Sequence, residues 1–301
     1  MDIYGFYTGK IFDAYDFLGC HLDGNRSYFR TYAPNASRVT VIGEFTGWKD
    51  YEMNRIHDGK FWELITDGVE DGMMYKYRIY GRDGSVTEHC DPYGFGMELR
   101  PDSASIARDM NRYVFHDTKW MRDRSDCRRG PLNIYEIHAG SWKTNPENEN
   151  GWYKYNELAD ILIPYLKENG YNYVEMMPIA EHPCDNSWGY QSTGFYSPTS
   201  RYGTADELRE FIDKCHQNGI GVLLDFVPVH FAVDGYGLSM YDGTAIYEYP
   251  NCDVGYSEWG SKNFNHARGE VQSHLQSCAN YWLKEYHFDG LRMDAISNII
   301  Y

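Results

Sequence analysis

The chain has 301 residues, enough for two domains, and its hydrophobic content of 42% is that of an ordinary globular protein. A net charge of −16 at pH 7 argues against nucleic acid and against an anionic membrane surface as partners, because both are bound through clustered Lys and Arg. Aromatic content is 17%, an excess that fits a protein that stacks rings on sugars, although most rings are expected to fill the core.

We expect neither a targeting signal nor a disulfide framework in this sequence. The seven cysteines are scattered, and none has the C-x-x-C spacing of a zinc or redox motif. The first residues lack the basic and apolar regions of a signal peptide, and no apolar run approaches the roughly 18–20 residues that span a bilayer. Free thiols favour a reducing compartment, so we expect a cytoplasmic protein.

From about Ser27 to Gly94 short alternating segments are separated by turn residues such as Asp58-Gly59 and Asp71-Gly72. Strands spaced near ten residues apart, with Gly and Asp between them, predict an immunoglobulin-like β-sandwich. We assign residues 1–20 to an N-terminal arm and 21–99 to the sandwich. The strands are expected at 27–33, 38–43, 61–65 and 75–80.

Residues 100–130 are polar and irregular, and they include Arg122, Arg124, Arg128 and Arg129. We interpret this segment as a connector packed between the two domains, without a regular element of its own.

Beyond about Pro131 strands and helices alternate. Strands are expected at 133–137, 171–177, 220–227 and 288–294, with helices between them at 156–168, 205–217 and 270–286. This alternation predicts parallel βα units, which close either as a doubly wound sheet or as an eight-stranded barrel. No Gly-x-Gly-x-x-Gly follows a strand, which weakens the dinucleotide-binding alternative. We assign 131–301 to the first four strands of an α/β (TIM-type) barrel.

Polar residues at the strand ends favour the barrel, because catalytic groups of a parallel barrel lie at the C-terminal ends of strands. Arg292 and Asp294 project to the same side of their strand, and an Arg beside a carboxylate favours the ionised form that a nucleophile needs. Asp225 ends another strand and His230 follows it. Such an acidic, aromatic pocket suits glycoside chemistry. An Arg-x-Asp on a strand is by itself more often a structural ion pair.

Several of these segments resemble the α-amylase superfamily (glycoside hydrolase family 13). The run Asp225-Phe226-Val227-Pro228-Val229-His230 is similar to its first signature, and 290–295 to its second. The segments 135–142, 181–183, 188–191, 197–204 and 242–245 resemble glycogen (1,4-α-glucan) branching enzymes in particular, and the resemblance covers essentially the whole chain.

The resemblance implies that Asp294 is a nucleophile that forms a covalent glycosyl-enzyme and that Arg292 holds it ionised and in position. This family cleaves an α-1,4 bond and transfers the glucan chain to a 6-hydroxyl, with net retention of configuration. The implied partner is therefore an α-1,4-glucan such as glycogen or amylose, and the full-length enzyme is expected to be a monomer.

The resemblance also implies a set of substrate-binding residues. Asp225 and His230 would bind hydroxyls of the sugar at the cleavage site, and Tyr190 would be its stacking platform. Trp188 and Gln191, in the same short motif as Tyr190, are further substrate-binding candidates.

The sandwich resembles the carbohydrate-binding module that precedes branching and debranching enzymes. Trp48, Trp62 and Lys76 fall where such modules carry glucan contacts. In many of these enzymes the module mainly packs against the barrel, so a purely structural role is the alternative.

Two departures from the family pattern limit the inference. Val229 stands where calcium-dependent amylases have Asn, and an apolar side chain cannot ligate a hard cation, so we expect no metal there and no cofactor. The acid/base Glu of the family matches no position up to Tyr301. We therefore expect an N-terminal portion that is inactive alone, with apolar residues such as Val222, Leu224 and Met293 lacking partners.

Two other functions remain open from the sequence. One is a debranching or trehalose-releasing hydrolase of the same superfamily, which would also carry the sandwich. The other is a non-catalytic protein that binds α-glucan without reacting with it.

Overall fold

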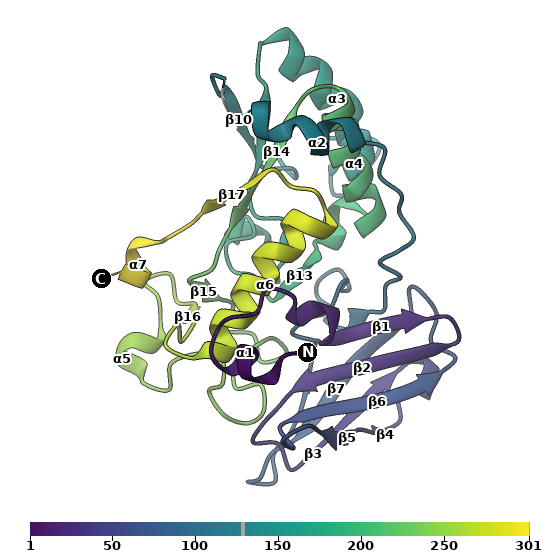
Figure 1. The fold of residues 1–301 in the computed structure, drawn as a ribbon, viewed down its shortest axis with the longest axis vertical. Coiled ribbons are helices and arrows are strands. Elements are labelled where there is room, and N and C mark those ends of the chain that lie inside the picture. The colour runs from purple at the N-terminus through teal and green to yellow at the C-terminus, as the bar shows by residue number, and fades with distance from the viewer. Residues whose placement is uncertain (128–129, 301) are drawn as a thin grey trace.

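The alternating segments of the N-terminal region pair into two antiparallel sheets in this computed structural model, which describes residues 1–127 and 130–300 (Figure 1). The sheet orders are β1-β2-β6-β5 and β4-β3-β7-β8, with β9 beside β7. In β7, Tyr75, Tyr77 and Ile79 are buried and alternate with partly exposed residues, as expected of a strand with one face on a core. The bounds are β1 Gly19–Asp23, β2 Arg26–Tyr32, β3 Arg38–Gly43, β4 Tyr51–Glu52, β5 Asn54–Ile56, β6 Phe61–Asp67, β7 Met74–Tyr80, β8 Val86–His89 and β9 Ser105–Ile106.

The second region contains a four-stranded parallel sheet in the order β10-β11-β14-β17, with helices between the strands (Figure 1). The expected sandwich followed by parallel βα units is confirmed. Helix α4 begins where expected, because Thr204 Oγ1 accepts from the Glu207 N–H while the Glu207 carboxylate accepts from the Thr204 N–H. The bounds are β10 Ile134–Ile137, α3 Tyr155–Glu168, β11 Tyr173–Met176, α4 Ala205–Gln217, β14 Gly221–Phe226, α6 Gly269–Glu285 and β17 Gly290–Met293.

Shorter elements lie in the loops and at the chain ends. In the described residues they are α1 Ile3–Tyr7, η1 Ala14–Asp16, η2 Glu44–Thr46, α2 Thr118–Cys127, β12 Ala180–Glu181, η3 Asp185–Ser187, β13 Gly194–Pro198, η4 Ser200–Tyr202, β15 His230–Phe231, α5 Cys252–Gly255, β16 Lys262–Asn263 and α7 Ser297–Ile300. Among the helices of the described ranges, none combines the length and the apolar character needed to cross a bilayer.

The strand register decides which side chains share a face of the parallel sheet. Asp225 on β14 is the direct partner of Arg292 on β17, so their side chains project to the same face. Val222 and Leu224 project to the opposite face and are buried in the hydrophobic core that includes the helices. The expectation that Val222 and Leu224 lack partners is therefore wrong, whereas Met293 is exposed.

The connector contains more regular structure than the sequence suggested. Its polar run 118–127 forms α2, although it carries no apolar stripe. Trp120 anchors this helix, because its indole N–H donates to Asp289 at the start of β17 at 2.8 Å. Arg128 and Arg129 of the predicted connector lie outside the described residues.

The N-terminal arm and the sandwich both pack against the barrel portion. The Phe6 carbonyl accepts from Ser273 Oγ of α6 at 2.9 Å, and Thr31 of β2 shares a 2.7 Å hydrogen bond with Tyr241. Figure 1 shows α6 beside α1, next to the edge of the sandwich. The sandwich is thus an integral support of the barrel portion.

Candidate functional site

The centre of the candidate site is one arginine shared by two carboxylates. Arg292 Nη1 donates to Asp225 Oδ1 and Oδ2 at 3.0 and 2.9 Å and to Asp294 Oδ1 at 2.6 Å. Asp225 is buried, whereas Asp294 is partly open to solvent at the end of β17. The Asp294 N–H donates to the Phe226 carbonyl at 3.0 Å, which continues the pairing of β17 with β14. The predicted pair is therefore placed beside Asp225.

Burial and the neighbouring charges act against each other at Asp225. Burial raises its pKa, hydrogen bonds from Tyr190 and Arg292 lower it, and the net shift is upward. Partial burial disfavours the charged Arg292, but hydrogen bonds from Arg292 to Asp225 and the negative charges of Asp225 and Asp294 raise its pKa overall. The guanidinium therefore stays positive between the two acids.

Tyr190 contacts this pair through its hydroxyl group. Its hydroxyl donates to Asp225 Oδ2 at 2.7 Å. Burial and the hydrogen bond to Asp225 raise the pKa of Tyr190, so the hydroxyl remains a donor. Gly189, which precedes it, has a φ of +89°, and a Cβ there would lie 2.3 Å from the Pro178 carbonyl oxygen. Only glycine lets the loop approach Pro178, just after β11, this closely.

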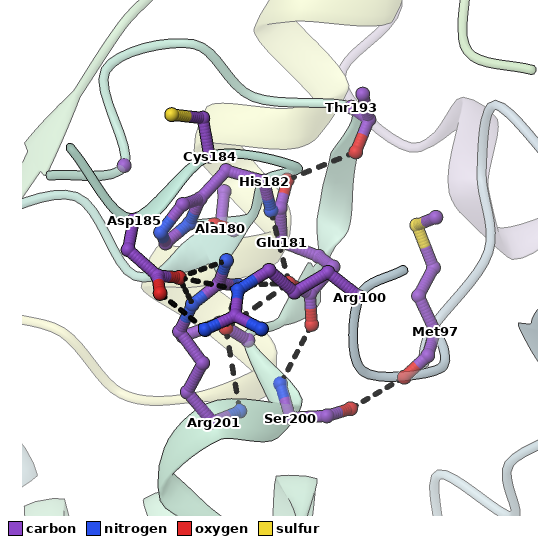
Figure 2. Close-up of polar contacts among 12 residues, drawn as sticks. Met97, Arg100, Ala180, Glu181, His182, Cys184, Asp185, Thr193, Ser200 and Arg201 are labelled. Atoms are coloured by element: carbon purple, nitrogen blue, oxygen red, sulfur yellow. Dashed lines mark hydrogen bonds and ion pairs between the residues drawn. The ribbon is translucent and has the colours of Figure 1, made fainter. Parts of the chain in front are cut away.

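An ion-pair network, buried at Arg201 and Glu181 and open to solvent at Asp185, holds the loop that carries Tyr190 (Figure 2). Arg201 Nη1 donates to Glu181 Oε1 at 2.6 Å, and Arg201 Nε donates to Asp185 Oδ1 at 2.8 Å. Arg100, from the connector, donates to the same Asp185 carboxylate. Hydrogen bonds from Arg100 and Arg201 lower the pKa of Asp185 to about 2. Two arginines from different segments thus fix the start of this loop.

His230 lies at the same mouth, just after β14, and is buried. Burial lowers its pKa, and the negative charge of Asp294 opposes that shift. Its Nδ1 finds no hydrogen-bond partner within the ranges that the structure describes. The side-chain amide of Gln191 donates to the Trp259 carbonyl at 3.2 Å and so joins two loops.

Trp188 lies at the neighbouring strand ends. The residue is 56% exposed, and the centre of its ring lies 6.3 Å from that of His138, which follows β10. The structure therefore places Trp188 next to the end of β10.

Three carboxylates extend along the inner face of the sheet. Oxygens of Glu136, Glu175 and Asp225 all lie within 4.8 Å of one another. Burial raises the pKa of Glu175, and the charges of Glu136 and Asp225 raise it further, against a smaller lowering by Arg292. The three acids therefore form one acidic face, on which the pKa of Glu175 is raised.

The three candidate glucan-binding residues of the sandwich differ in their exposure and contacts. Trp48 is 43% exposed, and its ring is available to a ligand. Lys76 donates from Nζ to Ser103 Oγ at 3.0 Å. Trp62 is only 4% exposed, its indole N–H donates to the Ala33 carbonyl at 2.9 Å, and Arg55 lies over its ring at 4.2 Å. The prediction that Trp62 contacts glucan is wrong, because the residue is almost fully buried and Arg55 covers a face of its ring.

The structure also shows residues that sequence reasoning missed. Trp259 reaches the site from a loop far from any predicted motif, and Glu136 and Glu175 face Asp225 from neighbouring strands. The alternation of Glu136 and Glu175 with apolar residues on their strands was the only available signal for those two. Nothing in the sequence placed Trp259.

Two family models match the chain. Residues 17–94 match carbohydrate-binding module 48 (isoamylase N-terminal domain), and residues 113–239 match the alpha amylase catalytic domain. These two ranges correspond to the sandwich and to the first part of the parallel sheet.

Curated relatives match the whole chain. A 1,4-alpha-glucan branching enzyme of Dechloromonas aromatica is 45% identical over 305 residues, covering 99% of this chain and 49% of that protein. A 1,4-alpha-glucan branching enzyme of Nitrosomonas eutropha is 46% identical over 311 residues, covering 100% of this chain and 42% of that protein. The chain thus spans about half the length of the curated relatives it matches.

Solved structures share the arrangement of both regions. A candidate alpha amylase from Salmonella typhimurium superposes with a TM-score of 0.76 at 28% identity, covering 94% of this chain and 44% of that one. An apo pullulanase from Paenibacillus barengoltzii gives a TM-score of 0.75 at 23% identity, covering 97% of this chain and 51% of that one. The second likeness speaks for the fold alone.

Proposed function

The chain belongs to the 1,4-alpha-glucan branching enzyme family of the α-amylase superfamily, and from this premise we propose that its carboxylate centre serves cleavage and transfer of α-1,4-glucan. The observation that carries the proposal is the single Arg292 nitrogen that bonds both Asp225 and Asp294. It lets two carboxylates stand side by side in a site that is partly buried.

In the proposed reaction an oxygen of Asp294 attacks the anomeric carbon of a glucose unit while the bond to the 4-oxygen of the next unit breaks. That oxygen takes a proton from a carboxylic acid of the complete enzyme. The 6-hydroxyl of an acceptor glucan then attacks the same carbon, returns its proton to that acid, and displaces Asp294. Two inversions give net retention, and water in place of the acceptor would give hydrolysis.

The other residues act on the bound sugar. Tyr190 presents its ring to the sugar while its hydroxyl holds Asp225. Asp225 and His230 bind sugar hydroxyls, and the unpartnered Nδ1 of the buried His230 supports that role. No residue of this chain is assigned as the proton donor, so we propose that these 301 residues bind glucan and hold the nucleophile while branching requires the remainder of the enzyme.

The partner is an α-glucan, and we extend the proposal to a monomeric complete enzyme in the cytoplasm. The five cysteines in the described part of the chain that are free, Cys20, Cys90, Cys184, Cys215 and Cys278, support a reducing location.

An iodine-stain assay with amylose tests the function. The complete enzyme that contains these residues should shift the amylose–iodine spectrum toward that of a branched product, and the 301-residue chain alone should not. Asp294→Asn in the complete enzyme should abolish turnover, because an amide is a poor nucleophile, while amylose binding survives. Turnover by that variant would refute the assignment.

A further inference from the structure

Trp259 lies on a tightly hydrogen-bonded turn between α5 and β16. Ser257 Oγ accepts from the N–H groups of Trp259 and Ser261, each at 3.2 Å, and the Ser257 N–H donates to the Ser261 carbonyl at 2.9 Å. Gly260 takes a φ of +77° at the apex. The backbone of Trp259 is therefore fixed without help from its side chain.

Trp259 is nevertheless 50% exposed. Its ring stands 5.3 Å from the ring of His230, with 45° between the two planes, and the Trp259 carbonyl accepts from Gln191. An exposed indole on a rigid turn beside buried polar residues is a common form of ligand contact, because a large apolar surface is held ready at little entropic cost.

A second exposed indole, Trp188, lies at the same edge of the sheet. The ring of Trp188 neighbours His138 after β10, whereas the ring of Trp259 neighbours His230 after β14, and β11 lies between those two strands in the sheet. Tyr190 bonds Asp225, which lies on β14, the strand that His230 follows. Trp259 is thus the exposed indole on the side of β14, the strand that carries Asp225.

We propose that Trp259 is a glucan-stacking residue that holds a glucose unit next to the one at Asp294. This inference rests on the proposed function and adds to it a binding position from a loop outside every motif used to derive that function. Stacking requires a flat apolar face open to solvent, which Trp259 has and the buried Trp62 lacks.

Binding of maltoheptaose to the 301-residue chain, measured by titration calorimetry, tests the proposal. Trp259→Ala should raise the dissociation constant about tenfold or more, and Trp259→Phe should raise it less, because a smaller ring keeps part of the face. Tyr4→Ala is the matched control, since Tyr4 is 72% exposed on α1 and should leave the constant unchanged. Wild-type affinity in Trp259→Ala, with binding lost in Tyr190→Ala, would overturn the role of Trp259 and leave the proposed function standing.

A measurement on the wild-type chain removes any doubt about variant folding. N-bromosuccinimide oxidises exposed indoles, and peptide mapping by mass spectrometry follows each tryptophan separately. Saturating maltoheptaose should slow oxidation of Trp259 relative to its rate without sugar. Equal oxidation rates of Trp259 with and without bound sugar would overturn the proposal, whereas failure of the wild-type chain to bind any maltoheptaose would overturn the proposed function itself.

Discussion

Arg292 and Asp225 face each other as register partners on neighbouring strands, and one guanidinium nitrogen bonds both oxygens of the buried carboxylate. The same nitrogen reaches Asp294. The local geometry of the site therefore depends on this arginine as much as on either acid.

Replacing Arg292 by Met should destabilise the chain by about 1–3 kcal/mol at pH 7, because Asp225 then keeps only the Tyr190 hydroxyl as a partner. Without the guanidinium, the already raised pKa of Asp225 should rise further. A carboxyl whose folded pKa exceeds its unfolded value costs stability at high pH and regains it on acidification, so the deficit should shrink from pH 7 to pH 5. Urea unfolding at both pH values checks this, with Arg292→Lys as the charge-preserving control. An equal deficit at both pH values would contradict the account.

A second network lies at the opposite, N-terminal end of the strands. His216 is buried between two carboxylates, with Nδ1 2.7 Å from Asp117 and Nε2 3.0 Å from Asp289. Burial lowers the pKa of His216, but the bonds to the two acids outweigh it and raise the pKa overall. The imidazole ring joins the segment before α2 to the start of β17.

Replacing His216 by Gln should therefore cost about 3–5 kcal/mol near pH 6, because two buried carboxylates lose the charge between them. A histidine with a raised folded pKa contributes its full stability below its unfolded pKa of about 6.5 and loses it as the pH rises through the raised value. The difference in the free energy of unfolding between wild type and His216→Gln, measured by chemical unfolding, should thus become smaller at high pH. His287→Gln, which removes a partly exposed ring bonded only to Asp117, should cost less. If this difference in unfolding free energy does not change with pH, the His216 imidazole is not charged in the folded protein.

His274 behaves in the opposite sense. It is fully buried among aromatic rings, including Tyr93 at 4.9 Å and Tyr247 at 5.3 Å, and burial lowers its pKa to about 3. Such a group contributes its full stability above the unfolded pKa and loses it as the pH falls toward the folded one. Between pH 6.5 and pH 5 the wild type should lose about 2 kcal/mol relative to His274→Leu. Parallel stability curves for the two proteins would show that His274 is not forced to stay neutral.

The two sandwich tryptophans should separate stability from binding. Trp62→Ala should destabilise the chain by about 3–5 kcal/mol, because it opens a cavity and leaves the Ala33 carbonyl unpaired. Trp48→Ala should stay within about 0.5 kcal/mol of wild type, since its ring is exposed. Thermal unfolding measures the effect on stability, and retardation in native gels containing amylose measures the effect on glucan binding. Loss of amylose retardation in a folded Trp62→Phe variant would restore Trp62 as a glucan contact.

Local patterns were sufficient to predict the elements that define the fold. Period-two alternation located β2, β3, β6 and β7, and strand–helix alternation located the parallel sheet. Helix α2 was missed because its sequence, rich in Arg and Asp, has no apolar stripe and depends on Trp120 for its anchor. Trp62 was misjudged because Phe61 and Trp62 are both buried, which breaks the alternation that the rest of the segment suggests.

The site was predictable in part for the same reason. Positions at the strand ends placed Asp225 and Asp294 at one edge, because parallel strands end together. The sharing of Arg292 between the two acids, and the arrival of Trp259 beside His230, depend on register and on a long loop. Neither of these two features produces a periodic pattern in the sequence from which it could be predicted.

Covalent trapping of a glycosyl-enzyme distinguishes Asp294 as the nucleophile from the other carboxylates of the site. A 5-fluoro-α-glucosyl fluoride carries a leaving group that needs no proton donor, so it can react with the 301-residue chain itself. Mass spectrometry after acid quench should find one glucosyl adduct on the peptide containing Asp294, and none in Asp294→Asn. An adduct on Asp225 or Glu175 instead, or no adduct in a chain that binds maltoheptaose, would contradict the claim.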